Sequence, residues 1–145
     1  TPLFIPMHYP DDIYEIEKVV SLMKGKGYII RNKYTVPQTL GIISRAQLLI
    51  GMRLHALIFA ASLGIPLIGL VYEPKIEGFL QYVDQVSAGH VKDLEYDKLK
   101  ALIDQVWNNR AKISDKLKSD IIDLKQKALE NAKIAVNLVD GNTQG

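Results

Sequence analysis

The sequence contains no cysteine among its 145 residues, and neither sign of charge is in large excess. Without thiols the chain cannot form a disulfide scaffold or a thiolate metal site, and a cysteine nucleophile is excluded. Eighteen Lys and Arg against sixteen Asp and Glu leave a formal net charge of +2. Nucleic-acid binders need a clustered positive excess to neutralise phosphates, so no nucleic acid is expected as a partner.

Long hydrophobic runs are also absent. No run approaches the roughly 18 to 20 residues of a membrane-spanning helix, and the longest apolar stretch, Ala56–Val71, is broken by two glycines and a proline. Hydrophobic residues nevertheless make up 48% of the chain, which is too high for a disordered protein, although aromatic residues are only 8%. The composition predicts a soluble domain with a core of its own.

The first ninety residues alternate short apolar runs with amphipathic stretches, a pattern typical of strands joined by crossover helices. Within the runs, apolar and polar residues do not alternate, and strands of that kind are covered on both faces and are typically parallel. The sequence therefore predicts an open α/β sheet. Its strands are expected at Leu3–Pro6, Tyr28–Ile30, Gln47–Ile50 and Pro66–Val71.

Three helices are predicted between these strands. Asp11 or Asp12 offers the N-cap of the first helix, and Thr35 can cap a second helix that starts with Val36-Pro37. The third helix, Met52–Leu63, is apolar at nearly every position, so we expect it to be buried nearly all round.

Beyond Gly89 the charges become dense and apolar residues recur every three or four positions as far as Val139. We expect a long helix, or a kinked pair, packed along the body of the domain. A coiled coil or a helix that docks on a partner is the alternative. The predicted organisation is thus an α/β domain over residues 1–90, C-terminal helices over 91–140 packed on the same domain, and a disordered tail over 141–145.

Ligands of parallel sheets bind beyond the carboxyl ends of the strands, where loops run into helix N-termini. Four loops of this kind are expected: Met7–Asp12, Arg31–Thr35, Gly51–His55 and Tyr72–Lys75. Among them they hold His8, Asp11, Asp12, Arg31, Lys33, Arg53, His55, Glu73 and Lys75. The aspartates after the first strand are first of all helix caps, and no group of His, Asp and Glu has a metal-binding spacing.

The loop Gly51–His55 is the most informative of the four. Gly51 frees the backbone at the strand exit, and the first turn of the next helix presents unpaired N–H groups and the positive end of the helix dipole. Arg53 is a planar cation suited to phosphate or carboxylate, and His55 can donate or transfer a proton. Together they indicate an acidic ligand. Taken separately, each has a structural alternative, a surface ion pair for the arginine and a hydrogen-bonded core residue for the histidine.

The fourth loop is weaker. Lys75 is expected to reach the same rim of the sheet, but most loop lysines are simply solvated. Glu73 can serve as an acid, as a base or as an acceptor for a hydroxyl group.

Part of the chain resembles a known family. The residues that carry the resemblance are Gly51–Ile58, Ala60-Ala61, Gly64-Ile65-Pro66 and Tyr72-Glu73-Pro74-Lys75. They resemble the signature of the polysaccharide pyruvyl transferases. That resemblance implies a two-domain fold of the GT-B type, in which two Rossmann-like halves face a cleft. The chain is similar to the C-terminal half, an open, mostly parallel Rossmann-like sheet with helices on both faces and trailing C-terminal helices. A complete member would be roughly twice as long, so we expect this chain to be a piece of a longer protein and inactive alone.

The resemblance also implies a reaction. A pyruvyl group passes from phosphoenolpyruvate to two hydroxyls of a sugar and forms a cyclic ketal in a cell-surface polysaccharide. In bacteria with surface-layer proteins, such ketals on the secondary cell-wall polymer provide the anionic anchor. By resemblance the motif Arg53-Leu54-His55 lines the donor site: Arg53 binds the anion, His55 binds it or protonates the enol carbon, and Leu54 contributes backbone. Lys75 and Glu73 are further substrate-binding residues. The resemblance implies no metal or organic cofactor. Phosphoenolpyruvate is the donor substrate.

The implied partners are phosphoenolpyruvate, an oligosaccharide acceptor carried on a lipid, and a missing N-terminal domain. The implied place is the cytoplasm or the inner face of the cell membrane. Two alternatives stay open. The chain can be the C-terminal domain of a GT-B glycosyltransferase or epimerase that binds a nucleotide sugar, with Glu73 on the ribose. It can also be a non-catalytic assembly module whose long C-terminal helix makes the contact.

Overall fold

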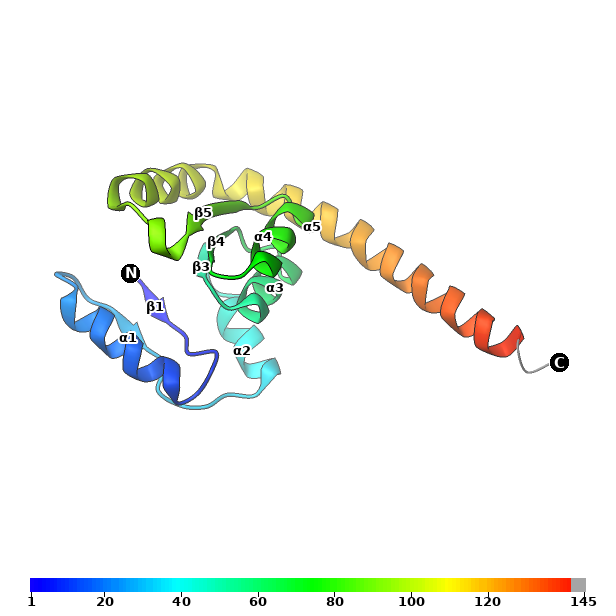
Figure 1. Ribbon diagram of the computed structural model, residues 1–145, viewed down its shortest axis with the longest axis horizontal. Helices are drawn as coiled ribbons and strands as arrows, with labels where there is room; N and C mark the ends of the chain where they lie inside the picture. The colour runs from blue at the N-terminus through cyan, green and yellow to red at the C-terminus, as the bar shows by residue number, and fades with distance from the viewer. Residues whose placement is uncertain (142–145) are drawn as a thin grey trace. The chain divides into compact units, whose positions relative to one another are not determined.

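The computed structural model in Figure 1 describes residues 1–141, and for residues 127, 128, 131, 135 and 138–141 it describes the backbone alone. The chain forms two compact units, Thr1–Ile42 and Ile43–Gly145. Every described strand pair is parallel, with β1 beside β2 in the first unit and the order β3-β4-β5 in the second. The prediction of an open parallel α/β fold with a long C-terminal helix is confirmed.

The first unit is a short parallel strand pair with a helix between its strands. Asp12 accepts hydrogen bonds from the backbone N–H groups of Met7 and His8 at 2.9 and 2.8 Å. Pro10, and not an aspartate, is the N-cap residue, so Asp11 and Asp12 lie in the first helical turn. Their negative charges interact favourably there with the positive end of the helix dipole. The elements are β1 (Leu3–Phe4), α1 (Asp11–Leu22), β2 (Tyr28–Ile29) and α2 (Val36–Ile43), which runs into the second unit.

The start of α2 agrees with the prediction. The side-chain oxygen of Gln38 accepts hydrogen bonds from the backbone N–H and the hydroxyl of Thr35, at 2.9 and 3.0 Å. Pro37 follows in the first turn, where its missing N–H costs no helical hydrogen bond. Thr35 therefore marks the helix start, although its hydroxyl acts here as a donor.

The second unit is a three-stranded sheet with a helix after each strand. Gly51 pairs with Gly69 across β3 and β4, and Val71 pairs with His90 across β4 and β5. The elements are β3 (Leu49–Gly51), α3 (Leu54–Ser62), β4 (Leu67–Val71), α4 (Pro74–Tyr82), β5 (Val86–His90), the single turn η1 (Val91–Asp93) and α5 (Tyr96–Gly141).

The core of this unit is centred on β4, whose apolar residues are covered on both faces. Leu67 and Ile68 are fully buried, as are Leu57 of α3 and Leu80 of α4. Gly69 is required by this packing, because a Cβ atom there would stand 2.3 Å from Cδ1 of Leu80. The close approach holds α4 against the sheet and so positions both ends of that helix.

The C-terminal segment is one continuous helix of 46 residues. In its first half Val106 and Leu117 are buried, and the hydroxyl of Ser114 donates to the carbonyl of Gly64 at 2.7 Å. Its second half extends away from the sheet of this unit (Figure 1), and Leu129 is 64% exposed. A partner for that half stays a prediction, and of the predicted tail, residues 142–145 lie outside the described part of the chain.

The second unit also differs from the sequence-based prediction. The helix α3 begins at Leu54 rather than Met52, and Ile58 is 38% exposed, so the prediction that this helix is buried nearly all round is wrong. The segment Tyr72–Lys75 is only partly a loop, because α4 begins at Pro74. The fifth strand, Val86–His90, has no counterpart in the prediction, because its burial alternates and it contains no continuous apolar run.

Candidate functional site

The strands β3 and β4 end side by side at one edge of the second unit's sheet. Because they are parallel and Gly51 pairs with Gly69, both chain exits leave from the same edge. Two residues, Met52 and Arg53, separate β3 from α3, and two others, Tyr72 and Glu73, separate β4 from α4. The structure thus brings together the two loops that carry Arg53, His55, Glu73 and Lys75.

The Arg-Leu-His motif forms the start of α3. Arg53 is the N-cap residue with an extended backbone, and its carbonyl accepts hydrogen bonds from the N–H groups of Ala56 and Leu57 at 3.0 and 3.3 Å. Leu54 and His55 are the first two residues of the helix, where N–H groups have no partner within the helix itself. Such unpaired N–H groups at a helix N-terminus can bind an anion, the kind of ligand that an arginine side chain also suits.

His55 is exposed, and its ring lies one turn before that of Phe59, with the ring centroids 6.5 Å apart. An exposed ring in the first helical turn is not a hydrogen-bonded core histidine, so that alternative does not apply. The position leaves His55 accessible to a ligand at the helix N-terminus.

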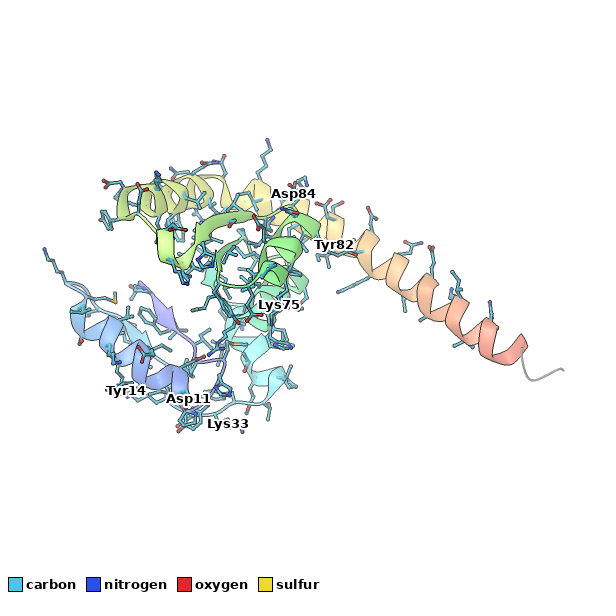
Figure 2. All side chains as sticks on the ribbon, viewed as in Figure 1. Asp11, Tyr14, Lys33, Lys75, Tyr82 and Asp84 are labelled. Carbon is cyan, nitrogen blue, oxygen red and sulfur yellow. The ribbon has the colours of Figure 1, made fainter. Side chains whose placement is uncertain are left out.

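Glu73 and Lys75 begin the next helix. Glu73 is the N-cap residue of α4, and Nζ of Lys75 lies 2.6 Å from its Oε2 atom. Figure 2 shows Lys75 at the N-terminal end of α4, with Tyr82 and Asp84 at the other end. The two side chains form an exposed ion pair within a single helical turn.

Electrostatics link the two loops. The pKa of Glu73 is lowered, first by the hydrogen bond from Lys75, then by one from Tyr72, and in addition by the positive charge of Arg53. The pKa of Lys75 is raised in return, chiefly by its hydrogen bond to Glu73. At neutral pH the edge therefore carries one carboxylate that can only accept hydrogen bonds, two cations and two helix N-termini. Such a set can bind an oxyanion and accept a hydrogen bond from a hydroxyl group.

The other polar residues expected on loops lie in the first unit. His8 pairs with Asp11 at 3.2 Å, and Arg31 forms an ion pair with Glu17. Figure 2 labels Asp11 and Lys33 in this unit. These contacts account for His8, Asp11 and Arg31 as local pairs, and we assign none of them to the site.

Two further features are absent from the described part of the chain. No three His, Cys, Asp or Glu residues of this part of the chain stand where they could hold a metal ion. No helix in it combines the length and the apolar composition that crossing a membrane requires.

Comparison with known families decides where the chain belongs. The family model described as polysaccharide pyruvyl transferase matches residues 1–74 of the 145. The chain belongs to the polysaccharide pyruvyl transferase family. No curated protein and no solved structure matches the chain. The matched range includes Arg53, Leu54, His55 and Glu73, and it ends one residue before Lys75.

The same edge of the sheet contains one more polar residue that the sequence does not single out. His90 ends β5, next to the end of β4, because it pairs with Val71. A continuous apolar run would have marked this strand, but Ser87 and Gly89 interrupt it. The strand could have been predicted instead from its position, because it is a short segment between two helices. His90 is the last residue of that segment.

Proposed function

We propose that this chain binds the donor in an enzyme that transfers a pyruvyl group from phosphoenolpyruvate to a sugar of a cell-surface polysaccharide and forms a ketal. The observation that carries the proposal is the pairing of two helix N-termini with Arg53 and Lys75 at one edge of the sheet. Phosphoenolpyruvate carries a phosphate and a carboxylate on three carbons. Such a compact, highly charged anion needs N–H donors and cations that are already in place.

The reaction needs one proton on carbon and one leaving phosphate. A proton adds to the methylene carbon of the enol, and a first sugar hydroxyl attacks the neighbouring carbon and gives up its own proton, which replaces the one delivered to carbon. The second hydroxyl then displaces phosphate from that carbon, and its proton leaves with the phosphate or passes to solvent. We assign anion binding to Arg53, and to His55 either anion binding or protonation of the methylene carbon.

The state of Glu73 narrows its role. Because its pKa is lowered, Glu73 is a carboxylate at neutral pH and is poorly suited to deliver the proton. We assign it the acceptor side of the reaction, where it would accept a hydrogen bond from an attacking sugar hydroxyl. Lys75, held by Glu73 at 2.6 Å, supplies a fixed positive charge for the donor.

The proposal also includes what the family resemblance implies about the acceptor, the place of action and the product. The acceptor is an oligosaccharide carried on a lipid, and the protein works in the cytoplasm or at the inner face of the membrane. The product ketal on a secondary cell-wall polymer is the anionic group that anchors a surface layer. The second half of a GT-B-like cleft completes the acceptor site.

Binding measurements on the full-length protein test the donor assignment. Calorimetry would compare phosphoenolpyruvate with a panel of nucleotide sugars, and we expect phosphoenolpyruvate to bind and the nucleotide sugars not to compete. Arg53→Ala should abolish the heat of binding. Arg45→Ala is the matched control, because Arg45 is an exposed arginine that precedes β3 and so lies away from the strand's carboxyl end.

The rival functions have distinct outcomes in this design. Preferred binding of a nucleotide sugar would contradict the proposed pyruvyl transfer and would favour a glycosyltransferase or an epimerase. Failure of the full-length protein to release phosphate from phosphoenolpyruvate in the presence of an oligosaccharide acceptor would favour an assembly module.

A further inference from the structure

The last strand of the sheet contains a bulge that places a histidine at the site edge. Gly69 pairs with Ser87 and Val71 pairs with His90, so two steps along β4 correspond to three along β5. Without the extra residue, Gly89 would stand opposite Val71. Bulges re-aim side chains and are frequent beside functional sites.

The bulge is built by two local features. Gly89 has a φ angle of +85°, a left-handed backbone conformation that residues other than glycine rarely adopt. Its N–H donates to the hydroxyl of Ser87 at 3.0 Å. These two features give the bulge a defined structure. They thereby fix His90 as the residue that pairs with Val71.

The paired residues show which face His90 occupies. Side chains opposite each other in neighbouring strands lie on the same face, so His90 shares the face of Val71. Gly69, two residues earlier in β4, faces Leu80 of α4. His90 therefore lies on the side of the sheet that α4 covers, beside the strand whose end leads into Glu73 and Lys75.

The ring of His90 is oriented by a backbone hydrogen bond. The N–H of Lys92 donates to Nδ1 of His90 at 3.3 Å. A ring whose Nδ1 accepts a hydrogen bond carries its proton on Nε2 when neutral. Among the described residues no group takes up that Nε2–H, and His90 is only half-buried. The donor is thus available to a ligand.

We propose that His90 is a further anion-binding residue of the donor site, whose Nε2–H donates to a phosphate or carboxylate oxygen of phosphoenolpyruvate. The inference rests on the proposed function and extends the site from β3 and β4 to β5. It predicts a ligand held from three adjacent strand ends: by Arg53 after β3, by Lys75 after β4 and by His90 at the end of β5.

Two amide variants of the full-length protein separate this role from a purely structural one. His90→Asn keeps an acceptor near Nδ1 and so preserves the bond from Lys92, but it removes the Nε2 donor. His90→Gln places an amide N–H near Nε2 and gives up the local bond. We expect His90→Asn to raise the Kd and the KM for phosphoenolpyruvate about tenfold, as loss of one charge-assisted hydrogen bond would do. The kcat should change little, and His90→Gln should retain more affinity.

Each outcome has a separate meaning. Weaker binding by His90→Asn than by His90→Gln, at an unchanged melting temperature of His90→Asn, supports the inference, because Asn preserves the bond from Lys92 and lacks only the Nε2 donor. Wild-type affinity in His90→Asn, with weakened folding in His90→Gln, overturns it and leaves His90 as a local cap. Failure of the wild-type protein to bind phosphoenolpyruvate overturns the proposed function, and the inference with it.

Discussion

The two ends of α4 carry ion pairs of the same chemistry in different settings. At the N-terminal end, Nζ of Lys75 lies 2.6 Å from a Glu73 oxygen, and at the C-terminal end, Nζ of Lys116 lies 2.6 Å from an Asp84 oxygen. Both pairs are exposed, so distance and exposure alone do not distinguish them. What differs is what each pair connects.

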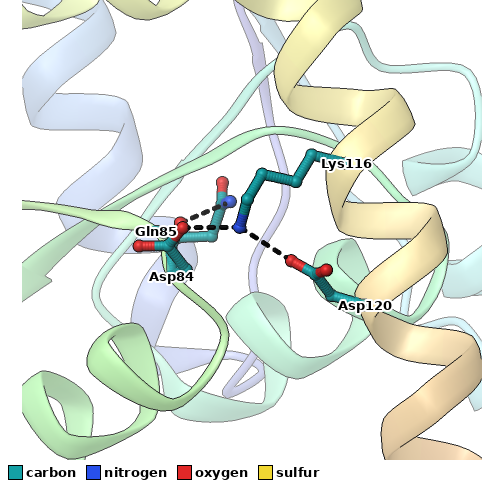
Figure 3. Close-up of polar contacts among 4 residues, drawn as sticks. All are labelled: Asp84, Gln85, Lys116 and Asp120. Carbon is teal, nitrogen blue, oxygen red and sulfur yellow. Dashed lines mark hydrogen bonds and ion pairs between the residues drawn. The ribbon is translucent and has the colours of Figure 1, made fainter.

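The pair at the C-terminal end joins separate elements. Figure 3 shows Lys116 of α5 between Asp84, in the turn after α4, and Asp120 of its own helix, at 2.6 and 2.9 Å. The hydrogen bond to Asp84 raises the pKa of Lys116 most, and the hydrogen bond to Asp120 raises it further. The lysine is satisfied by two partners, which is typical of a structural contact.

The pair at the N-terminal end joins nothing distant in the chain. Glu73 and Lys75 are two residues apart, and they lie beside the N-terminus of a second helix and in the field of Arg53. A short-range pair at such an edge adds little to folding, but it sets the charge and position of groups that a ligand meets. The setting at the strand ends, and not the strength of the pair, therefore distinguishes the ion pair of the candidate site from the structural one.

The largest expected effect is at the motif that precedes α3. Arg53→Ala and His55→Ala should each lower turnover of the full-length enzyme about tenfold to a hundredfold, because each removes a positioned donor or acid. Steady-state kinetics measure the loss, and circular dichroism checks that the fold is kept. Wild-type rates in both variants would remove these residues from the site.

Displacing α4 should disturb both of its ends at once. Gly69→Ala places a Cβ atom 2.3 Å from Leu80, and overpacking of this kind costs about 1 to 3 kcal/mol of stability. Chemical denaturation measures that loss, and donor binding should weaken in parallel. Gly78→Ala on the same helix is the control: no atom lies within 4 Å of its added Cβ, so stability should stay level or rise.

The pH dependence of activity tests the charge state at the N-terminal end. The pKa of Glu73 is lowered chiefly by Lys75, so activity that needs the carboxylate should persist at neutral pH and be lost only as the pH falls through that lowered value. Lys75→Met removes the main cause and should move the acid limb of the rate profile to higher pH. Glu73→Gln should abolish that limb and lower kcat. An acid limb in Lys75→Met at the wild-type pH would contradict the assignment.

The smallest effect is expected at the C-terminal end. Lys116→Met should lower the melting temperature slightly and leave kcat/KM unchanged, because the pair is exposed and screened by salt. Thermal melts at low and high ionic strength measure the contribution. A fall in kcat/KM comparable to that of Arg53→Ala would show that α5 and the site are coupled, and the distinction between the two ends would fail.

Much of the second unit is predictable from local patterns. The apolar run that becomes β4 has no polar interruption, and Gly51 stands at the predicted exit from β3, so the strand ends and the Arg-Leu-His motif are correctly expected at a helix start. The strand β5 is not predictable in this way. Val86–His90 has a weak local preference, and it forms because β4 offers an unpaired parallel edge.

The amino-acid order was sufficient to establish a parallel α/β chain of the pyruvyl transferase family with a basic motif at a helix N-terminus, because periodicity, capping and short motifs are local properties. Tertiary structure alone decided the partnership of Arg53 with Glu73, the separate meanings of the two lysine pairs, and the place of His90. Each of these depends on strand register, in which a single extra residue in β5 exchanges a glycine for a histidine opposite Val71. Register follows from contacts between segments distant in the chain, so no local pattern in the sequence contains it.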